Sequence, residues 1–161
     1  MKPRTALTAC AMGALVLMLP GCGGSGSSTG PTTTPPAAPV STVVAQGAFQ
    51  IGTVATAIDL GDPCDFVEFI EFQTSATGDI AAVVDWTFAT SDLDIGLGAG
   101  SCTCLLIVAD ACGTEIAESE STTAKPERIT AANQPAGSYT LVVVNWTLER
   151  ESASYQVTLT R

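Results

Sequence analysis

The chain has 161 residues, 46% of them hydrophobic, and its 16 acidic and 6 basic residues give a formal net charge of −10 at pH 7. This length suffices for one domain with a single core. A negative field repels phosphate backbones and anionic headgroups, which disfavours nucleic acid as a partner and direct docking of the domain on a membrane. Solubility of an exported protein is sufficient to explain the acidity.

The N-terminus has the features of an export signal. Lys2 and Arg4 precede an apolar run from Ala6 to Leu19, which is too short for a stable transmembrane helix and is typical of a signal-peptide core. The sequence therefore predicts a signal peptide over residues 1–21.

The end of this segment, Leu19-Pro20-Gly21-Cys22, resembles the lipobox of bacterial lipoproteins. The resemblance implies that the Cys22 thiol carries a diacylglycerol and that palmitate-type acyl chains anchor the protein. Two or three chains would hold it essentially permanently, since each buried methylene contributes about 0.8 kcal/mol. Pro20 departs from the usual small residue, and an ordinary secretory signal is the alternative. Gly23 stands where Asp would favour the inner membrane, so we expect the outer membrane of the cell envelope.

Residues 22–44 are predicted to form a disordered tether. The stretch "GGSGSSTGPTTTPPAAPV" has no charge and almost no large apolar group, so it cannot bury enough surface to fold. It would span on the order of 25 Å as a coil and about 50 Å if extended. One domain is expected over residues 45–161.

Alternation of apolar and polar residues with period two, bounded by Gly, Pro, Asn and Asp, predicts an all-β domain. No long helical pattern with caps is present. Seven to nine short strands at this spacing predict a sandwich of two antiparallel β-sheets. Strands are expected over 66–73, 79–88, 92–97, 104–109, 114–118, 128–131, 139–146 and 154–160, with one or two more between 46 and 60.

The alternation also assigns faces. Trp86 is expected to point inward and Asp85 outward, while Leu93 lies inward between outward Asp92 and Asp94. The stretch "VVDWTF" at 83–88 returns as "VVNWTL" at 143–148, which convergence of similar strands explains at least as well as an internal duplication.

Several stretches resemble the bacterial pre-peptidase C-terminal domain: "EFIEFQTSATGDIAAVVDW" (68–86), "SDLDIGL" (91–97), "GTEIAES" (113–119), "QPAGSYTLVVVNW" (134–146) and "SASYQVTLT" (152–160). Phe72, Asp92, Asp94 and "PAGSY" occupy the places of that family's loose motifs. The resemblance implies a jelly-roll-like sandwich of a kind appended to secreted peptidases, where it assists secretion or binds substrate. Here no peptidase accompanies the module and residues 99–113 are cysteine-rich, so the peptidase association does not transfer.

The cysteines predict two disulfides. Cys10 leaves with the signal peptide and Cys22 is lipidated, and an even number remains for an oxidising compartment: Cys64, Cys102, Cys104 and Cys112. Cys102 and Cys104 lie too close in an extended chain to pair comfortably, so Cys112 is expected to pair with one of them and Cys64 with the other. Zinc is disfavoured because there is no Cys-x-x-Cys spacing and no histidine.

The absence of histidine also rules out Ser-His-Asp and Cys-His catalysis. Lys125, the one lysine left after signal removal, precedes a proline in a loop, with no desolvating environment for Ser-Lys catalysis. Glu118 and Glu120 are neighbours on one solvent face and are expected to be a solvated edge rather than an acid–base pair. The sequence predicts no enzyme.

Asp92 and Asp94 form a candidate metal site. Their i, i+2 spacing lets two carboxylates approach one hard cation, and Asp85 or Asp110 could add oxygens. Some relatives of the resembled family bind calcium, so calcium stays open as a cofactor, and no other cofactor is expected. The favoured interpretation is a solvated face that needs no ligand.

These features predict a membrane-anchored, non-catalytic surface lipoprotein that acts as a binding or scaffold module for an extracellular protein or polysaccharide. One alternative is an accessory or regulator of an envelope peptidase, by analogy with the resembled family. Another is a carbohydrate-binding module, which would need an exposed aromatic platform; the few aromatic residues are expected to alternate mostly inward.

Overall fold

The computed structural model describes residues 37–60, 64–104, 112 and 114–161. The predicted signal peptide, Cys22 and most of the tether lie outside these residues. Residues Ala37–Arg161 form one compact unit. In the described part of the chain, no helix has the length and apolar character needed to cross a membrane.

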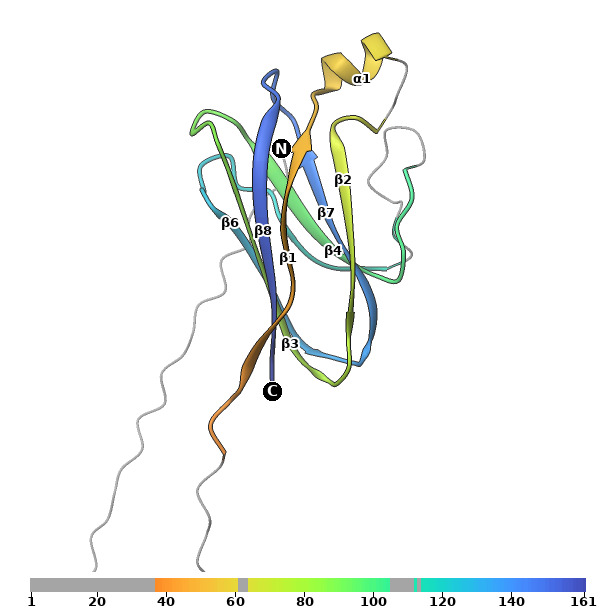
Figure 1. The fold of residues 1–161 in the computed structure, drawn as a ribbon, viewed down its shortest axis with the longest axis vertical. Coiled ribbons are helices and arrows are strands. Elements are labelled where there is room, and N and C mark those ends of the chain that lie inside the picture. The colour runs from red at the N-terminus through yellow and green to blue at the C-terminus, as the bar shows by residue number, and fades with distance from the viewer. Residues whose placement is uncertain (1–36, 61–63, 105–111, 113) are drawn as a thin grey trace, which may run out of the picture. The chain divides into compact units, whose positions relative to one another are not determined.

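Two four-stranded antiparallel sheets make up the domain (Figure 1). Sheet A has the order β1-β8-β3-β6, and its strands are β1 (Ser41–Ile51), β8 (Glu151–Thr160), β3 (Gly78–Trp86) and β6 (Glu127–Gln134). Sheet B has the order β2-β7-β4-β5, with β2 (Val67–Thr74), β7 (Gly137–Asn145), β4 (Leu93–Ala99) and β5 (Glu115–Ser119). The predicted all-β sandwich is confirmed.

The core lies between the sheets and follows the predicted alternation. Ile80, Val84 and Trp86 of β3 are buried, as are Leu93 and Ile95 of β4. Strands β3 and β4 therefore each contribute every second side chain to one apolar layer, which is the arrangement that period two dictates.

The start of the domain differs from the prediction. Strand β1 begins at Ser41, inside the segment expected to be tether, because its first residues pair with the last strand, as in Ser41 with Thr160. A short helix, α1 (Val54–Leu60), was not expected. Thr53 begins it by accepting a hydrogen bond from the Thr56 amide through Oγ1 (3.1 Å). The strand expected over 104–109 lies almost entirely outside the described residues.

Different parts of the chain lie at the two ends of the sandwich. At the terminal end, Val40 and Arg161 exchange backbone hydrogen bonds of 2.8 and 3.0 Å. At the other end, Ile51 pairs with Glu151. The antiparallel registers bring four connections to this second end, which we call the loop end. Their described residues are 52–60 with 64–66, 87–92, 120–126 and 146–150. Figure 1 shows α1 and the β7–β8 connection together at the top and the C-terminus at the bottom.

Two disulfides form, Cys64–Cys104 and Cys102–Cys112. Cys112 thus pairs with one of the two close cysteines and Cys64 with the other, as expected. The Cys102–Cys112 bridge lies against Gly98, where an added Cβ would come within 2.6 Å of the Cβ of Cys112. The two disulfides show an extracytoplasmic protein, because such bonds persist in oxidising compartments.

Candidate functional site

The three aspartates proposed for calcium do not form one cluster. Asp85 lies on β3 of sheet A, where its Oδ1 is 3.8 Å from the Lys125 Nζ. Asp94 lies on β4 of sheet B, and Asp92 directly precedes that strand. Among the described residues, no group of three or more His, Cys, Asp or Glu side chains could hold a metal ion. Asp110 lies outside the described residues, and calcium binding stays a prediction.

Asp94 instead forms a pair with Trp146. The indole Nε1 donates a hydrogen bond of 2.7 Å to the Asp94 Oδ2. The ring of Trp146 packs at 5.9 Å from the ring of buried Phe66, and its backbone amide donates to the carbonyl of Asp92 (3.3 Å). The indole is held on these sides, yet Trp146 is 53% exposed.

The electrostatic environment of Asp94 is negative. The pKa of Asp94 is raised to about 6, mainly by burial. The hydrogen bond from Trp146 opposes this rise, and the charges of Asp92, Glu120 and Glu127 add to it. We call these four carboxylates the acidic group. Its members lie at the beginning of β4, at the beginning of the β5–β6 connection and at the first residue of β6, all at the loop end.

Two members of the acidic group have a buried oxygen without a donor. The Asp92 Oδ1 and the Glu127 Oε2 have no hydrogen-bond partner among the described residues. Glu127 is completely buried, and its other oxygen accepts a hydrogen bond from the Ser121 amide (3.0 Å). Buried polar oxygens are nearly always satisfied in native proteins, so an unsatisfied carboxylate oxygen here calls for an explanation.

Glu151, the first residue of β8, is also completely buried, and both of its oxygens are used. Its Oε2 accepts from the Thr87 amide (3.0 Å) and from the Phe88 amide (3.3 Å), and its Oε1 also lies 3.3 Å from the Phe88 amide. This carboxylate therefore fixes the beginning of the β3–β4 connection to the β8 strand.

Asn145 fixes the β7–β8 connection. This fully buried side chain donates from Nδ2 to the carbonyls of Gly52 and Glu149, both at 2.8 Å. Its Oδ1 accepts from the amide (3.0 Å) and the hydroxyl (2.7 Å) of Thr147. One amide group thus holds residues 146–150 against the end of β1.

Asp65 completes the framework beneath α1. Its carbonyl accepts from the Gly52 amide (2.7 Å), and its Oδ2 accepts from the Thr56 hydroxyl. Arg150 pairs with the same carboxylate at 3.1 Å. An added Cβ at Gly52 would collide with Asp65, so a glycine is required for this close approach.

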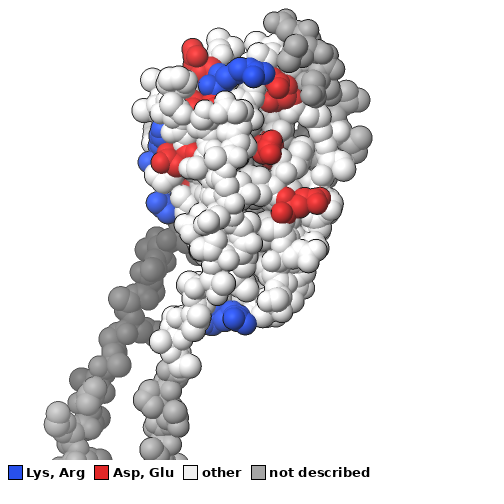
Figure 2. All heavy atoms as spheres, in the orientation of Figure 1, with Lys and Arg blue, Asp and Glu red and all other residues white. Residues whose placement is uncertain are grey.

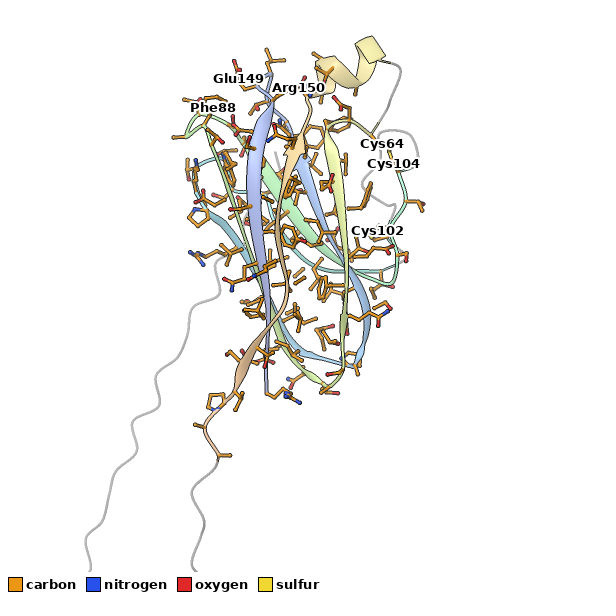
Figure 3. The ribbon with its side chains drawn as sticks, viewed as in Figure 1. Cys64, Phe88, Cys102, Cys104, Glu149 and Arg150 are labelled. Atoms are coloured by element: carbon orange, nitrogen blue, oxygen red, sulfur yellow. A yellow bond between two sulfur atoms is a disulfide. The ribbon has the colours of Figure 1, made fainter. Side chains whose placement is uncertain are left out.

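Three large hydrophobic residues are exposed on this framework: Phe88 at 48%, Trp146 at 53% and Leu148 at 81%. The other large exposed hydrophobics of the described chain, Val40 and Val43, lie near the terminal end. Figure 3 shows Phe88, Glu149 and Arg150 at the same end of the sandwich. On the face drawn in Figure 2, most charged side chains also gather in the upper part.

The exposure of Trp146 and Phe88 corrects part of the expectation that aromatic residues point mostly inward. Trp86, Phe72 and Tyr139 are buried as expected. In β7 the odd-numbered positions such as Asn145 point inward, so Trp146 falls on the outer side. The alternation of "YTLVVVNW" carried this signal, although its similarity to "VVDW" suggested the opposite face.

No family model matches this chain, and no curated protein matches it. One solved structure that resembles it is the Yersinia pseudotuberculosis-derived mitogen, with 16% identity and a TM-score of 0.45 over 72% of this chain and 85% of the mitogen chain. Another is infectious bursal disease virus, Gx strain, with 10% identity and a TM-score of 0.34 over 76% of this chain and 31% of the viral chain. At these TM-scores neither likeness carries an argument about function.

Proposed function

We propose that this chain is a lipid-anchored, non-catalytic module of the bacterial cell envelope that binds a protein partner through its loop end. The observation that carries the proposal is the exposure of Phe88, Trp146 and Leu148 on a rigid framework of buried polar side chains. Exposed apolar side chains on well-held loops, surrounded by polar residues, are typical of interaction surfaces.

The direction of the chain supports this role. Val40, close to the first described residue, pairs with Arg161 at the terminal end. Strand β8 has 10 residues, and at about 3.3 Å per residue it separates the two ends by about 30 Å. The loop end therefore lies at the opposite end of the domain from the first described residues.

The non-catalytic character is inferred from the sequence, which contains no histidine. The resemblance to the pre-peptidase C-terminal domain supports a binding role, and the outer membrane is the location we propose from Gly23. The anchor, its membrane and the binding surface are tested separately.

The anchor is tested by growing bacteria that express the full chain with a labelled fatty acid. We expect the label on the wild-type chain and none on Cys22→Ser, with Cys10→Ser as a matched control that keeps the label. Labelling of the Cys22→Ser chain would contradict lipidation at this residue. Fractionation of the labelled cells then assigns the membrane.

The binding surface is tested by site-specific photo-crosslinking. A benzophenone side chain is introduced at Leu148 in the full chain, and at Gln156 on the outer face of sheet A as the control. We expect a discrete protein adduct from position 148 in intact cells and none from position 156. Equal adducts from both positions, or none from position 148, would contradict the proposal.

A carbohydrate-binding module is the second candidate, because Trp146 exposes an indole that a sugar ring could stack on. It predicts that the wild-type chain binds glycans on an array and that Trp146→Ala abolishes this binding. Buried Trp86 is not a suitable control, so Phe88→Ala serves as the exposed aromatic control.

A further inference from the structure

The acidic group forms no salt bridge with a basic residue in the described part of the chain. After residue 36 the sequence contains four basic residues: Lys125, Arg128, Arg150 and Arg161. The described residues form two salt bridges, Lys125 with Asp85 and Arg150 with Asp65. Arg128 pairs with Val83 on the outer side of sheet A, and Arg161 lies at the terminal end. None of the four forms a salt bridge with a carboxylate of the acidic group.

The carboxylates without a basic partner include the two that have an unsatisfied oxygen. Among the described residues, no donor reaches the Asp92 Oδ1 or the Oε2 of fully buried Glu127. The charges of both residues also raise the pKa of Asp94. A buried carboxylate that is neither paired nor fully hydrogen-bonded is unfavourable. A cation brought by a ligand would lower this cost.

The first tryptophan of the chain shows what a complete arrangement contains. The Lys125 Nζ lies 5.5 Å from the ring centroid of Trp86 and 3.8 Å from the carboxylate of Asp85. It also donates to the Thr87 carbonyl (3.1 Å). An aromatic face and a carboxylate thus bind one ammonium group, as cation–π contacts commonly do.

The second tryptophan has the same two elements without the cation. Trp146 is exposed and donates to Asp94 at 2.7 Å. Two residues further along β4, the space above Gly96 is open, because an added Cβ there meets nothing within 4 Å. The neighbour of Gly96 on β5 is Glu118, which adds another exposed carboxylate beside this space.

The class of cation follows from the geometry. A hard metal ion needs several oxygens gathered around one point, and no such group of three is present in the described residues. An organic cation needs only a ring face and one or two carboxylates within reach. The site therefore fits a lysine or arginine side chain better than a metal ion.

We propose that Trp146 and Asp94 bind a lysine or arginine side chain of the protein partner, in the way that Trp86 and Asp85 bind Lys125. This inference rests on the proposed function and names the chemistry of the partner. The positive charge of a basic segment on the partner would balance the negative charge of the acidic group. Residues of the partner next to that segment would contact exposed Leu148.

The test uses the full chain in detergent micelles and nuclear magnetic resonance of the indole N–H groups. The chain has two tryptophans, so it gives two indole signals, and Trp146→Phe assigns them. The probe is a capped tetralysine peptide, with capped tetraglutamine, cellotetraose and calcium chloride as separate comparisons. We expect tetralysine alone to shift the Trp146 signal, and the Trp86 signal to stay in place.

Two variants measure the contribution of each element. Asp94→Asn should weaken tetralysine binding about tenfold, because a charge-assisted contact is lost. Trp146→Leu should weaken it about threefold, as expected for an exposed cation–π contact. Glu115→Gln near the terminal end makes the same change in net charge and should have less than a twofold effect. Added salt should weaken binding to the wild-type chain.

Equal weakening by Asp94→Asn and Glu115→Gln would overturn the inference, because binding would then follow net charge alone. A Trp146 shift with cellotetraose or calcium chloride and none with tetralysine would overturn it in favour of a sugar or a metal ion. If no probe shifts Trp146 while the crosslink from Leu148 forms, this inference fails and the proposed function stands. If the crosslink also fails, both fall.

Discussion

Two fully buried glutamates at the loop end, Glu151 and Glu127, differ in how completely the protein satisfies them. Each is the first residue of a strand in sheet A. Both oxygens of Glu151 accept backbone hydrogen bonds from the β3–β4 connection. Glu127 uses one oxygen for the Ser121 amide and leaves the other without a donor.

This difference distinguishes Glu151, which has a structural role, from Glu127, which is a candidate for ligand binding. A carboxylate whose oxygens all bond to the protein needs nothing further and serves stability. A carboxylate with an orphan oxygen lowers stability, and such groups persist where a ligand or ion completes them. The carboxylate of Glu151 is therefore fully satisfied by the β3–β4 connection, while the carboxylate of Glu127 is not fully satisfied by the described residues.

The largest effect on stability is expected from the substitution Glu151→Ala. We expect the free energy of unfolding to fall by about 4 kcal/mol, because the Thr87 and Phe88 amides lose a charged acceptor and a cavity forms. Denaturant unfolding of the variant measures this change. Exposed Glu149→Ala is the control and should change the value by less than about 0.5 kcal/mol. A similar loss of unfolding free energy in the two variants would show that Glu151 does not fix the β3–β4 connection.

Asn145→Asp tests the hydrogen bonds by which Asn145 fixes the β7–β8 connection. The substitution replaces the donors to the Gly52 and Glu149 carbonyls by a charged acceptor, so we expect a loss of about 3 kcal/mol. Thermal and denaturant unfolding report the change. Asn133→Asp, at an exposed position, is the matched control, and an equal loss there would contradict the role given to Asn145.

The same substitution at the two glutamates sharpens the comparison directly. Glu151→Gln should lower the free energy of unfolding by about 2 kcal/mol, because one acceptor becomes a donor facing backbone amides. Glu127→Gln should leave it unchanged or raise it by up to about 1 kcal/mol, because an uncompensated charge is removed beside Asp94. If Glu127→Gln were as destabilising as Glu151→Gln, Glu127 would be an ordinary structural residue.

The pH dependence of stability should reveal the acidic group. The pKa of Asp94 is raised from 3.8 to about 6, so the folded state favours the protonated form. Its contribution to stability is complete below about pH 4 and is lost as the pH rises through 6. Unfolding at pH 4.5 and pH 7 should therefore show a smaller difference in Asp94→Asn than in the wild-type chain. An unchanged difference would remove Asp94 as its source.

The smallest effect is expected at Lys125, which joins the two sides of the loop end. Lys125→Met removes the contacts with Asp85, Trp86 and the Thr87 carbonyl. We expect a loss of at most about 1 kcal/mol, since exposed ion pairs and cation–π contacts are weak. Arg128→Met is the control. A loss above 2 kcal/mol would mean that the two sides are more strongly coupled than these contacts imply.

Local sequence determined the strands and their inner faces. The alternation in β3 and β4 placed Val84, Trp86 and Leu93 in the core. The cysteine spacing predicted two disulfides but left open which of Cys102 and Cys104 pairs with Cys112. These features follow from period two and from the short reach of neighbouring cysteines. The beginning of β1 at Ser41 was not readable, because that segment is extended by pairing with β8 rather than by its own pattern.

Tertiary structure decided which of these side chains meet. "VVDW" and "VVNW" are nearly the same sequence, yet Trp86 is buried and Trp146 is exposed, because the two strands present opposite parities to the core. The pairing of Trp146 with Asp94, and the effect of the charges of Asp92, Glu120 and Glu127 on the pKa of that carboxyl group, depend on segments that are far apart in the chain. Strand register and sheet order set those distances, and neither is encoded in the period of one strand.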